Sequence, residues 1–135
     1  MSWPCRYFPN RAAITEQCGY EPTGAMWPAE PSWLVPETLA ANYIRDWQGK
    51  RPALLVMLPC GFPFLIDGRA YDDEKGGYFG DGWVVTGEPP RITVSPSINF
   101  KRHYHGFLQH GVISDDCEGR TFPNARGFPP ESAHV

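Results

Sequence analysis

The sequence predicts a mainly β protein, with an α+β arrangement as the alternative. Fifteen Pro and fourteen Gly among 135 residues interrupt the chain too often for long helices. Its apolar content is concentrated in five Trp, six Tyr and eight Phe, which suit sheet faces and binding surfaces. We therefore expect one domain with about six short, mostly antiparallel strands and one short helix.

The chain divides into four parts within that domain. Residues 1–35 form an extended arm rich in Pro and Trp, residues 36–47 a helix, residues 52–118 the β core and residues 119–135 an irregular tail. The helix is expected because Pro36 suits a first turn and apolar residues then recur every four positions, at Leu39, Tyr43 and Trp47.

Apolar runs bounded by turn residues predict the strands of the core. These runs span residues 53–58, 62–67, 83–87, 91–95, 103–109 and 111–114. Residues 68–82 carry several Gly and Asp and predict a flexible connecting loop.

Aromatic residues are the candidate binding residues. Disordered segments are usually poor in aromatics, so three Trp indicate that the arm packs on something. It either wraps its own domain or docks on another subunit or protein, because Trp is enriched at interface anchors. The candidates are Trp3, Trp27, Trp33, Tyr78, Phe79 and Tyr104.

Charge and composition exclude several classes of function. The net charge is −3 and the basic residues form no stripe, so we do not expect nucleic-acid binding. No apolar run approaches the roughly 18 residues of a membrane span. The first ten residues lack the layout of a secretory signal, so we expect a cytoplasmic protein. The four cysteines have irregular spacing and are expected to be reduced thiols, with a Cys5–Cys18 disulfide as the alternative.

The stretch RHYHGFLQHG at residues 102–111 raises the question of a metal site. His103 and His105 have the spacing that places two side chains on one face of a strand. His110 adjoins Gly111 where the hairpin must turn, so we discount it as a ligand. A neighbouring thiol, Cys117, is a candidate third ligand for zinc.

Whether Cys117 joins the two histidines depends on the length of the turn. A two-residue turn pairs Gln109 with Val112 and places Cys117 on the face away from the histidines. A three-residue turn pairs Leu108 with Val112 instead. It gathers four groups on one face: His103, His105, Asp115 and Cys117. Cys60, in a Pro-Cys-Gly turn, is a further candidate ligand.

Several pieces of the β core resemble a family of small phage and prophage proteins without assigned function. They span residues 51–118 and read RP at 51–52, LP at 58–59, GW at 82–83, GEPP at 87–90, PSI at 96–98 and YHG at 104–106. This resemblance implies a β-rich, phage-linked protein. A more distant similarity, to small domains with a Cys-rich turn and a Cys-x-x-His pair, implies zinc. This chain departs from that pattern, since its turn holds only Cys60 and Arg102 stands three positions before His105.

The function we expect is non-enzymatic binding or assembly through protein–protein contacts. The partner would be a second copy of the chain or a host or virion protein, in the cytoplasm of a host cell or within a virion, without a cofactor. The alternative is a structural or hydrolytic zinc-binding domain centred on His103, His105, Cys117 and Cys60. A Cys–His nucleophilic pair is not favoured, because no oxyanion-forming segment is evident.

Overall fold

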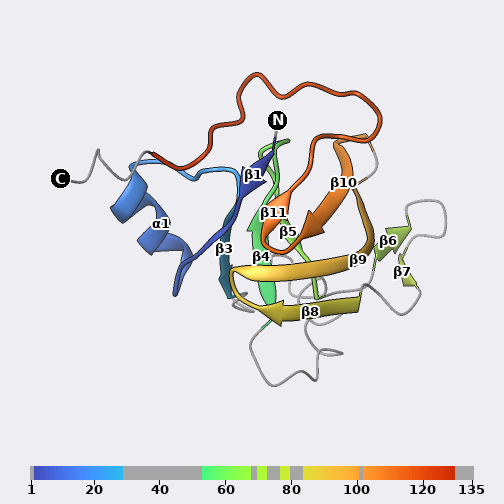
Figure 1. Cartoon of the computed structure of the whole chain (residues 1–135), viewed down its shortest axis with the longest axis horizontal. Helices are drawn as coiled ribbons and strands as arrows, with labels where there is room; N and C mark the ends of the chain where they lie inside the picture. Colours follow the sequence, from blue (N-terminus) through green and yellow to red (C-terminus); the bar gives the residue numbers. More distant parts are fainter. Residues whose placement is uncertain are drawn as a thin grey trace.

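The fold is mainly β, as predicted, in a computed structural model that describes residues 2–28, 53–67, 70–72, 77–79, 84–100 and 102–129. A five-stranded antiparallel sheet has the order β1-β11-β10-β9-β8 (Figure 1). Its strands are β1 (Trp3–Pro4), β8 (Val84–Glu88), β9 (Arg91–Phe100), β10 (Tyr104–Gln109) and β11 (Val112–Ile113).

A second sheet of four strands has the order β2-β3-β4-β5. These are β2 (Arg6–Tyr7), β3 (Ala25–Pro28), β4 (Leu54–Met57) and β5 (Pro63–Leu65). β2 runs parallel to β3, and the other pairs are antiparallel. A separate two-stranded ribbon joins β6 (Ala70–Asp72) to β7 (Gly77–Phe79).

The six strands predicted for the core are all present, whereas the loop predicted over residues 68–82 contains the β6–β7 hairpin. The helix predicted over residues 36–47 lies outside the described residues. The described helix is instead α1 (Arg11–Cys18), within the arm. The Asn10 side chain accepts a hydrogen bond from the Ala13 N–H at 2.9 Å and caps its start. Gly19, with a φ of 80°, ends it in the left-handed conformation that glycine adopts readily.

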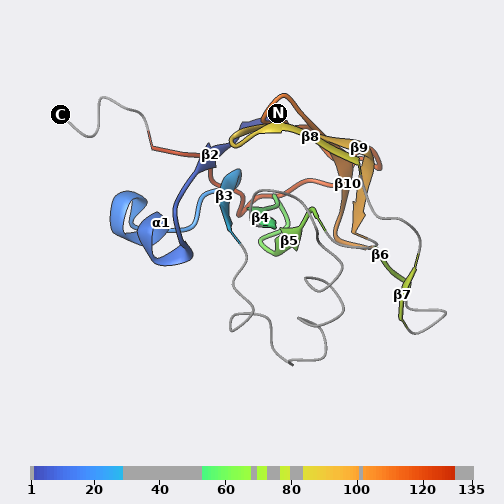
Figure 2. The same ribbon diagram turned by 90° about the horizontal axis from the view of Figure 1, so that it is seen from below.

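The two large sheets pack face to face, and Figure 2 shows the five-stranded sheet curving over β3, β4 and β5. Met26, Leu54 and Val56 contribute to the core between the sheets, with residues from the other sheet that include Ile92, Ile98 and Leu108. The alternate residues of the four-stranded sheet, such as Trp27, Leu55 and Met57, belong to a second core with Phe8 and Ile14. β4 is therefore buried on both faces, which explains the continuous apolar run ALLVML.

The described part of the N-terminal arm, residues 2–28, contributes strands to both sheets. β1 pairs with β11 and β2 pairs with β3, so the chain passes from one sheet to the other at Cys5. Trp3 is 5% exposed and Trp27 is 2% exposed, so both pack within their own domain, which is the first of the two alternatives for the arm. Trp3 packs in the core between the two sheets, and Trp27 packs in the second core. Trp33 lies outside the described residues.

The tail has no helix or strand between residues 119 and 129 and crosses the molecule from the β10 side to the α1 side (Figure 1). Phe122 contacts Trp3 edge-on at 6.3 Å between ring centroids, and Phe128 stacks on Phe8 at 5.9 Å. The guanidinium of Arg126 lies 3.8 Å from the centre of the Tyr20 ring. These contacts attach the segment to both cores.

Candidate functional site

The β10–β11 hairpin has the two-residue turn. Gln109 pairs with Val112, and Leu108 pairs with Ile113. His110 and Gly111 both have positive φ, 51° and 76°, as expected for a two-residue turn that follows the twist of its strands. A Cβ at Gly111 would lie 2.5 Å from the backbone oxygen of Pro90, so this turn also requires glycine for space. The register that would gather the metal candidates is therefore not adopted.

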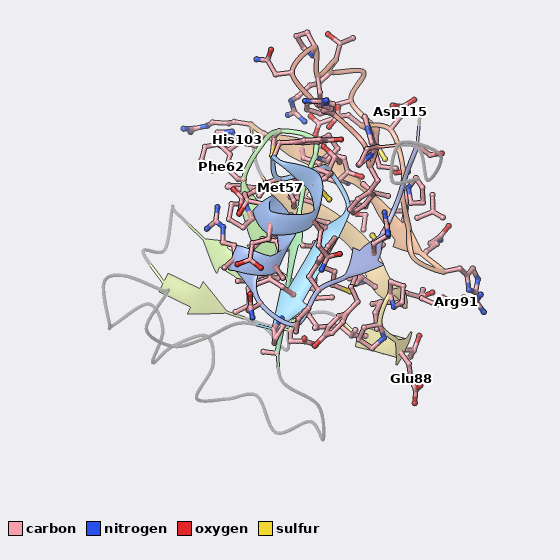
Figure 3. The ribbon with its side chains drawn as sticks, turned by 90° about the vertical axis from the view of Figure 1, so that its left-hand side faces the viewer. Met57, Phe62, Glu88, Arg91, His103 and Asp115 are labelled. Carbon is pink, nitrogen blue, oxygen red and sulfur yellow. The ribbon has the colours of Figure 1, made fainter. Side chains whose placement is uncertain are left out.

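The two histidines do not share a strand face, because the chain reverses at Arg102 before β10 begins. Arg102 has a φ of 72°, and the His103 N–H donates to the Phe100 carbonyl at 2.9 Å. The His103 ring then packs against two phenylalanines, with centroid distances of 5.0 Å to Phe62 and 4.6 Å to Phe100. Figure 3 shows His103 beside Phe62, far from the Glu88–Arg91 end of the sheet.

The geometry does not support the predicted zinc site. Cys117 is exposed and Cys60 is half-buried, and both are free thiols, as are Cys5 and Cys18. Within the described ranges, which include all four candidate ligands, no group of three or more His, Cys, Asp or Glu side chains is placed to hold a metal ion. The spacing of His103 and His105 does not place them on one strand face, because His103 lies in the turn before β10.

Asp116 is buried and organises the loop that follows β11. Its carboxylate accepts hydrogen bonds from three backbone N–H groups: those of His105 at 2.7 Å, Glu118 at 2.9 Å and Arg120 at 3.0 Å. The Arg120 Nη1 donates a fourth, at 2.8 Å. Burial acts to raise the pKa of Asp116, but the hydrogen bonds from Arg120, His105 and Glu118 outweigh it and hold the pKa below its ordinary value.

This loop brings Glu118 to His105, which in turn contacts Ser97 on the neighbouring strand. The Ser97 Oγ lies 3.0 Å from His105 Nε2. The His105 Nδ1 lies 3.3 Å from Glu118 Oε2, an ion-pair distance. The sequence analysis identified His105 but neither Ser97 nor Glu118. Their approach depends on the β9–β10 register and on the Asp116 loop, and no spacing along the chain signals either.

The solvent-facing side of the five-stranded sheet, called here the outer face, is the other notable surface. Strand register and burial assign it the residues Pro4, Val84, Thr86, Thr93, Ser95, Ser97, Asn99, His105, Phe107, Gln109 and Val112. Phe107 is 41% exposed, Val112 39% and Val84 66%. The same register places Glu88 and Arg91 on this face, paired at its β8–β9 end, and its other described residues include no Lys, Arg, Asp or Glu. Glu118, from the loop after β11, lies beside His105.

One further binding candidate, Tyr104, is not available at the surface. Tyr104 is fully buried and its hydroxyl donates to the Ser114 carbonyl at 2.8 Å, which corrects its assignment as a binding residue. Burial raises the pKa of Tyr104 to about 12. Tyr78 and Phe79 lie on β7, whose backbone alone is described.

Comparison with protein families, with curated proteins and with solved structures finds no match to this chain. None of the described residues forms a helix long and apolar enough to cross a membrane.

Proposed function

We propose that this chain is an assembly protein whose copies bind one another through the outer face of the five-stranded sheet. The expectation of a phage- or prophage-encoded protein, in a host cytoplasm or a virion, belongs to the same proposal. It rests on the sequence resemblance alone.

The exposure of Phe107 and Val112 on a face whose charged residues, Glu88 and Arg91, lie only at its β8–β9 end carries the proposal. Phe107 lies on β10, the central strand of the sheet, and Val112 lies on the adjacent β11 with Pro4 directly across from it. Scattered exposed apolar residues are ordinary. Here, however, they share one face with small uncharged side chains, and interface cores are poor in charge and rich in aromatic residues.

A second copy of the chain suits this face better than a charged partner does. In a two-fold contact each patch meets itself, so a charge on the patch would approach its like. The chain carries a net charge of −3, and the outer face is a surface on which two copies can meet without that repulsion. Glu88 and Arg91, which pair across the β8–β9 turn, have opposite signs and add no net charge at the margin.

Sedimentation velocity over a concentration series tests the proposal. We expect the full chain to associate as its concentration rises, and Val112→Asp to remain monomeric because it places a charge in the contact. Tyr7→Asp is the matched control, since Tyr7 is 41% exposed but lies on β2 of the other sheet. A wild-type chain that stays monomeric up to its solubility limit would overturn the proposal. Equal association of Val112→Asp would overturn the choice of this face.

A further inference from the structure

Beyond the assembly role, we propose that Ser97, His105 and Glu118 form a nucleophile, a general base and an orienting carboxylate that act on small, uncharged carboxylic esters. The three residues come from β9, from β10 and from the loop after β11. They lie at the end of the outer face away from Pro4 and Val112.

The first contact is that between the nucleophile and its base. Ser97 Oγ and His105 Nε2 are 3.0 Å apart, within the range for direct proton transfer from a serine hydroxyl to an imidazole. The β9–β10 register fixes this distance. His105 pairs with Asn99, and the register then shifts beyond Gly106, which brings Ser97 alongside the imidazole.

The second contact selects the tautomer of the base. When Nδ1 carries the ring proton and faces Glu118 Oε2 at 3.3 Å, Nε2 is left as the acceptor toward Ser97. The same carboxylate stabilises the imidazolium that forms when the serine proton is transferred. Serine, histidine and carboxylate thus stand in the order that acyl transfer requires.

Hydrogen bonds to Asp116 hold the loop that carries Glu118 in a fixed position beside His105. Asp116 binds the backbone N–H groups of both His105 and Glu118, so one buried carboxylate fixes the base and the orienting group relative to each other. Arg120 Nη1 donates to Asp116 and also lies 3.5 Å from Glu118 Oε2, the oxygen that faces His105, and so restrains that side chain. Asp116 and Arg120 are therefore positioning residues.

The reaction is acyl transfer to Ser97 followed by hydrolysis. Ser97 Oγ forms a bond to the ester carbonyl carbon as its proton passes to His105 Nε2. The carbon–oxygen bond to the alcohol then breaks, and the alcohol departs with that proton. A water molecule then attacks the acyl carbon as its proton passes to His105 Nε2. The bond between the acyl group and Ser97 Oγ breaks, Ser97 takes that proton, and the carboxylic acid is released. No oxidant or cofactor is needed.

The surroundings of the three residues define the substrate class. Phe107 is two residues beyond His105 on the same face, is 41% exposed and offers an apolar surface to an acyl chain. Asn99, exposed and directly across from His105, offers a neutral amide donor on the face where an oxyanion would develop. Because the outer-face residues next to the site are uncharged, a small uncharged ester fits it better than an anionic one.

Two probes of the full chain test this proposal: labelling by a fluorophosphonate, and hydrolysis of p-nitrophenyl acetate. We expect one fluorophosphonate adduct, located on Ser97 by peptide mapping and absent from Ser97→Ala. Ser2→Ala is the matched control, because Ser2 is an exposed serine outside the outer face, and it should keep both the adduct and the activity. His105→Ala should lower the hydrolysis rate about 100-fold, the lower range for loss of a general base.

The role of Glu118 requires a measurement that a merely structural role would not change. We expect Glu118→Gln to lower kcat about tenfold or more while KM stays within about twofold, since an orienting carboxylate acts in the transition state. Glu118 is half exposed, so this variant should fold even if His105→Ala does not, and urea unfolding checks both. Hydrolysis by Ser97→Ala at the wild-type rate, or no adduct on Ser97 in the folded protein, would overturn the proposal.

Discussion

Replacing Asp116 tests the loop on which the candidate site depends. Its side chain is fully buried and accepts four hydrogen bonds, three from backbone N–H groups and one from Arg120. Hydrogen bonds to a charged group contribute about 1.5–3 kcal/mol each but are not additive within one network. Removing one member of a fully buried ion pair costs about 3–5 kcal/mol, and Arg120 is 29% exposed, so the lower end of that range applies. We expect Asp116→Ala to lower the free energy of unfolding by about 3 kcal/mol, a large part of the roughly 5–15 kcal/mol typical of a domain.

The pH dependence follows from the direction of the pKa shift. The pKa of Asp116 in the folded chain lies below its ordinary value of 3.8, because the hydrogen bonds from Arg120, His105 and Glu118 outweigh the effect of burial. Its ionised form therefore stabilises the fold fully above about pH 3.8, and that contribution is lost as the pH falls through the lower, folded-state pKa. The stability difference between wild type and Asp116→Asn should be constant near neutral pH and should shrink in acid.

Urea unfolding followed by Trp fluorescence measures both effects. Asp115→Asn is the control, since Asp115 is the exposed neighbour and its replacement should change stability by no more than about 0.5 kcal/mol. The reasoning is refuted if Asp116→Ala matches Asp115→Asn at neutral pH. It is also refuted if the Asp116→Asn difference grows as the pH falls.

Three further predictions concern buried groups. Burial raises the pKa of Cys5 to about 12, so Cys5 should react with a disulfide reagent at pH 8 only when the protein unfolds. The exposed Cys117 should react at once, and mass mapping of the modified thiols distinguishes the two. The pKa of Tyr104 is raised to about 12, so this side chain should stay un-ionised at pH 11. The tyrosine absorbance at 295 nm should therefore rise equally in native wild type and native Tyr104→Phe up to pH 11. Gly106→Ala should cost about 1–3 kcal/mol in denaturant unfolding, because its Cβ would lie 2.1 Å from the buried Tyr104 hydroxyl; a stability equal to wild type would contradict this packing.

The core strands could be predicted from sequence because their signals are local. Short apolar runs between turn residues predict β4, β5 and β8–β11. The sequence allows a turn of two or of three residues at His110, and the structure has the two-residue turn. The N-terminal strands could not be predicted in the same way. β1 and β2 have two residues each and owe their existence to backbone pairing with β11 and β3, which lie far along the chain.

The candidate site was predictable only in part. His105 stood out because three histidines cluster in the sequence, and the same cluster favoured a metal that the geometry does not support. Ser97 and Glu118 are ordinary residues in a strand and an acidic turn. They meet His105 because of a register shift beyond Gly106 and a buried carboxylate at Asp116, which are tertiary features.

A charge-swap experiment at the centre of the outer face tests the assembly proposal most directly. Phe107→Asp and Phe107→Lys each place a charge on the central strand, so each variant alone should sediment as a monomer. In a face-to-face contact the two charges attract, so an equimolar mixture should recover the associated species. Single variants that associate as wild type does, or a mixture that remains monomeric, would contradict the account.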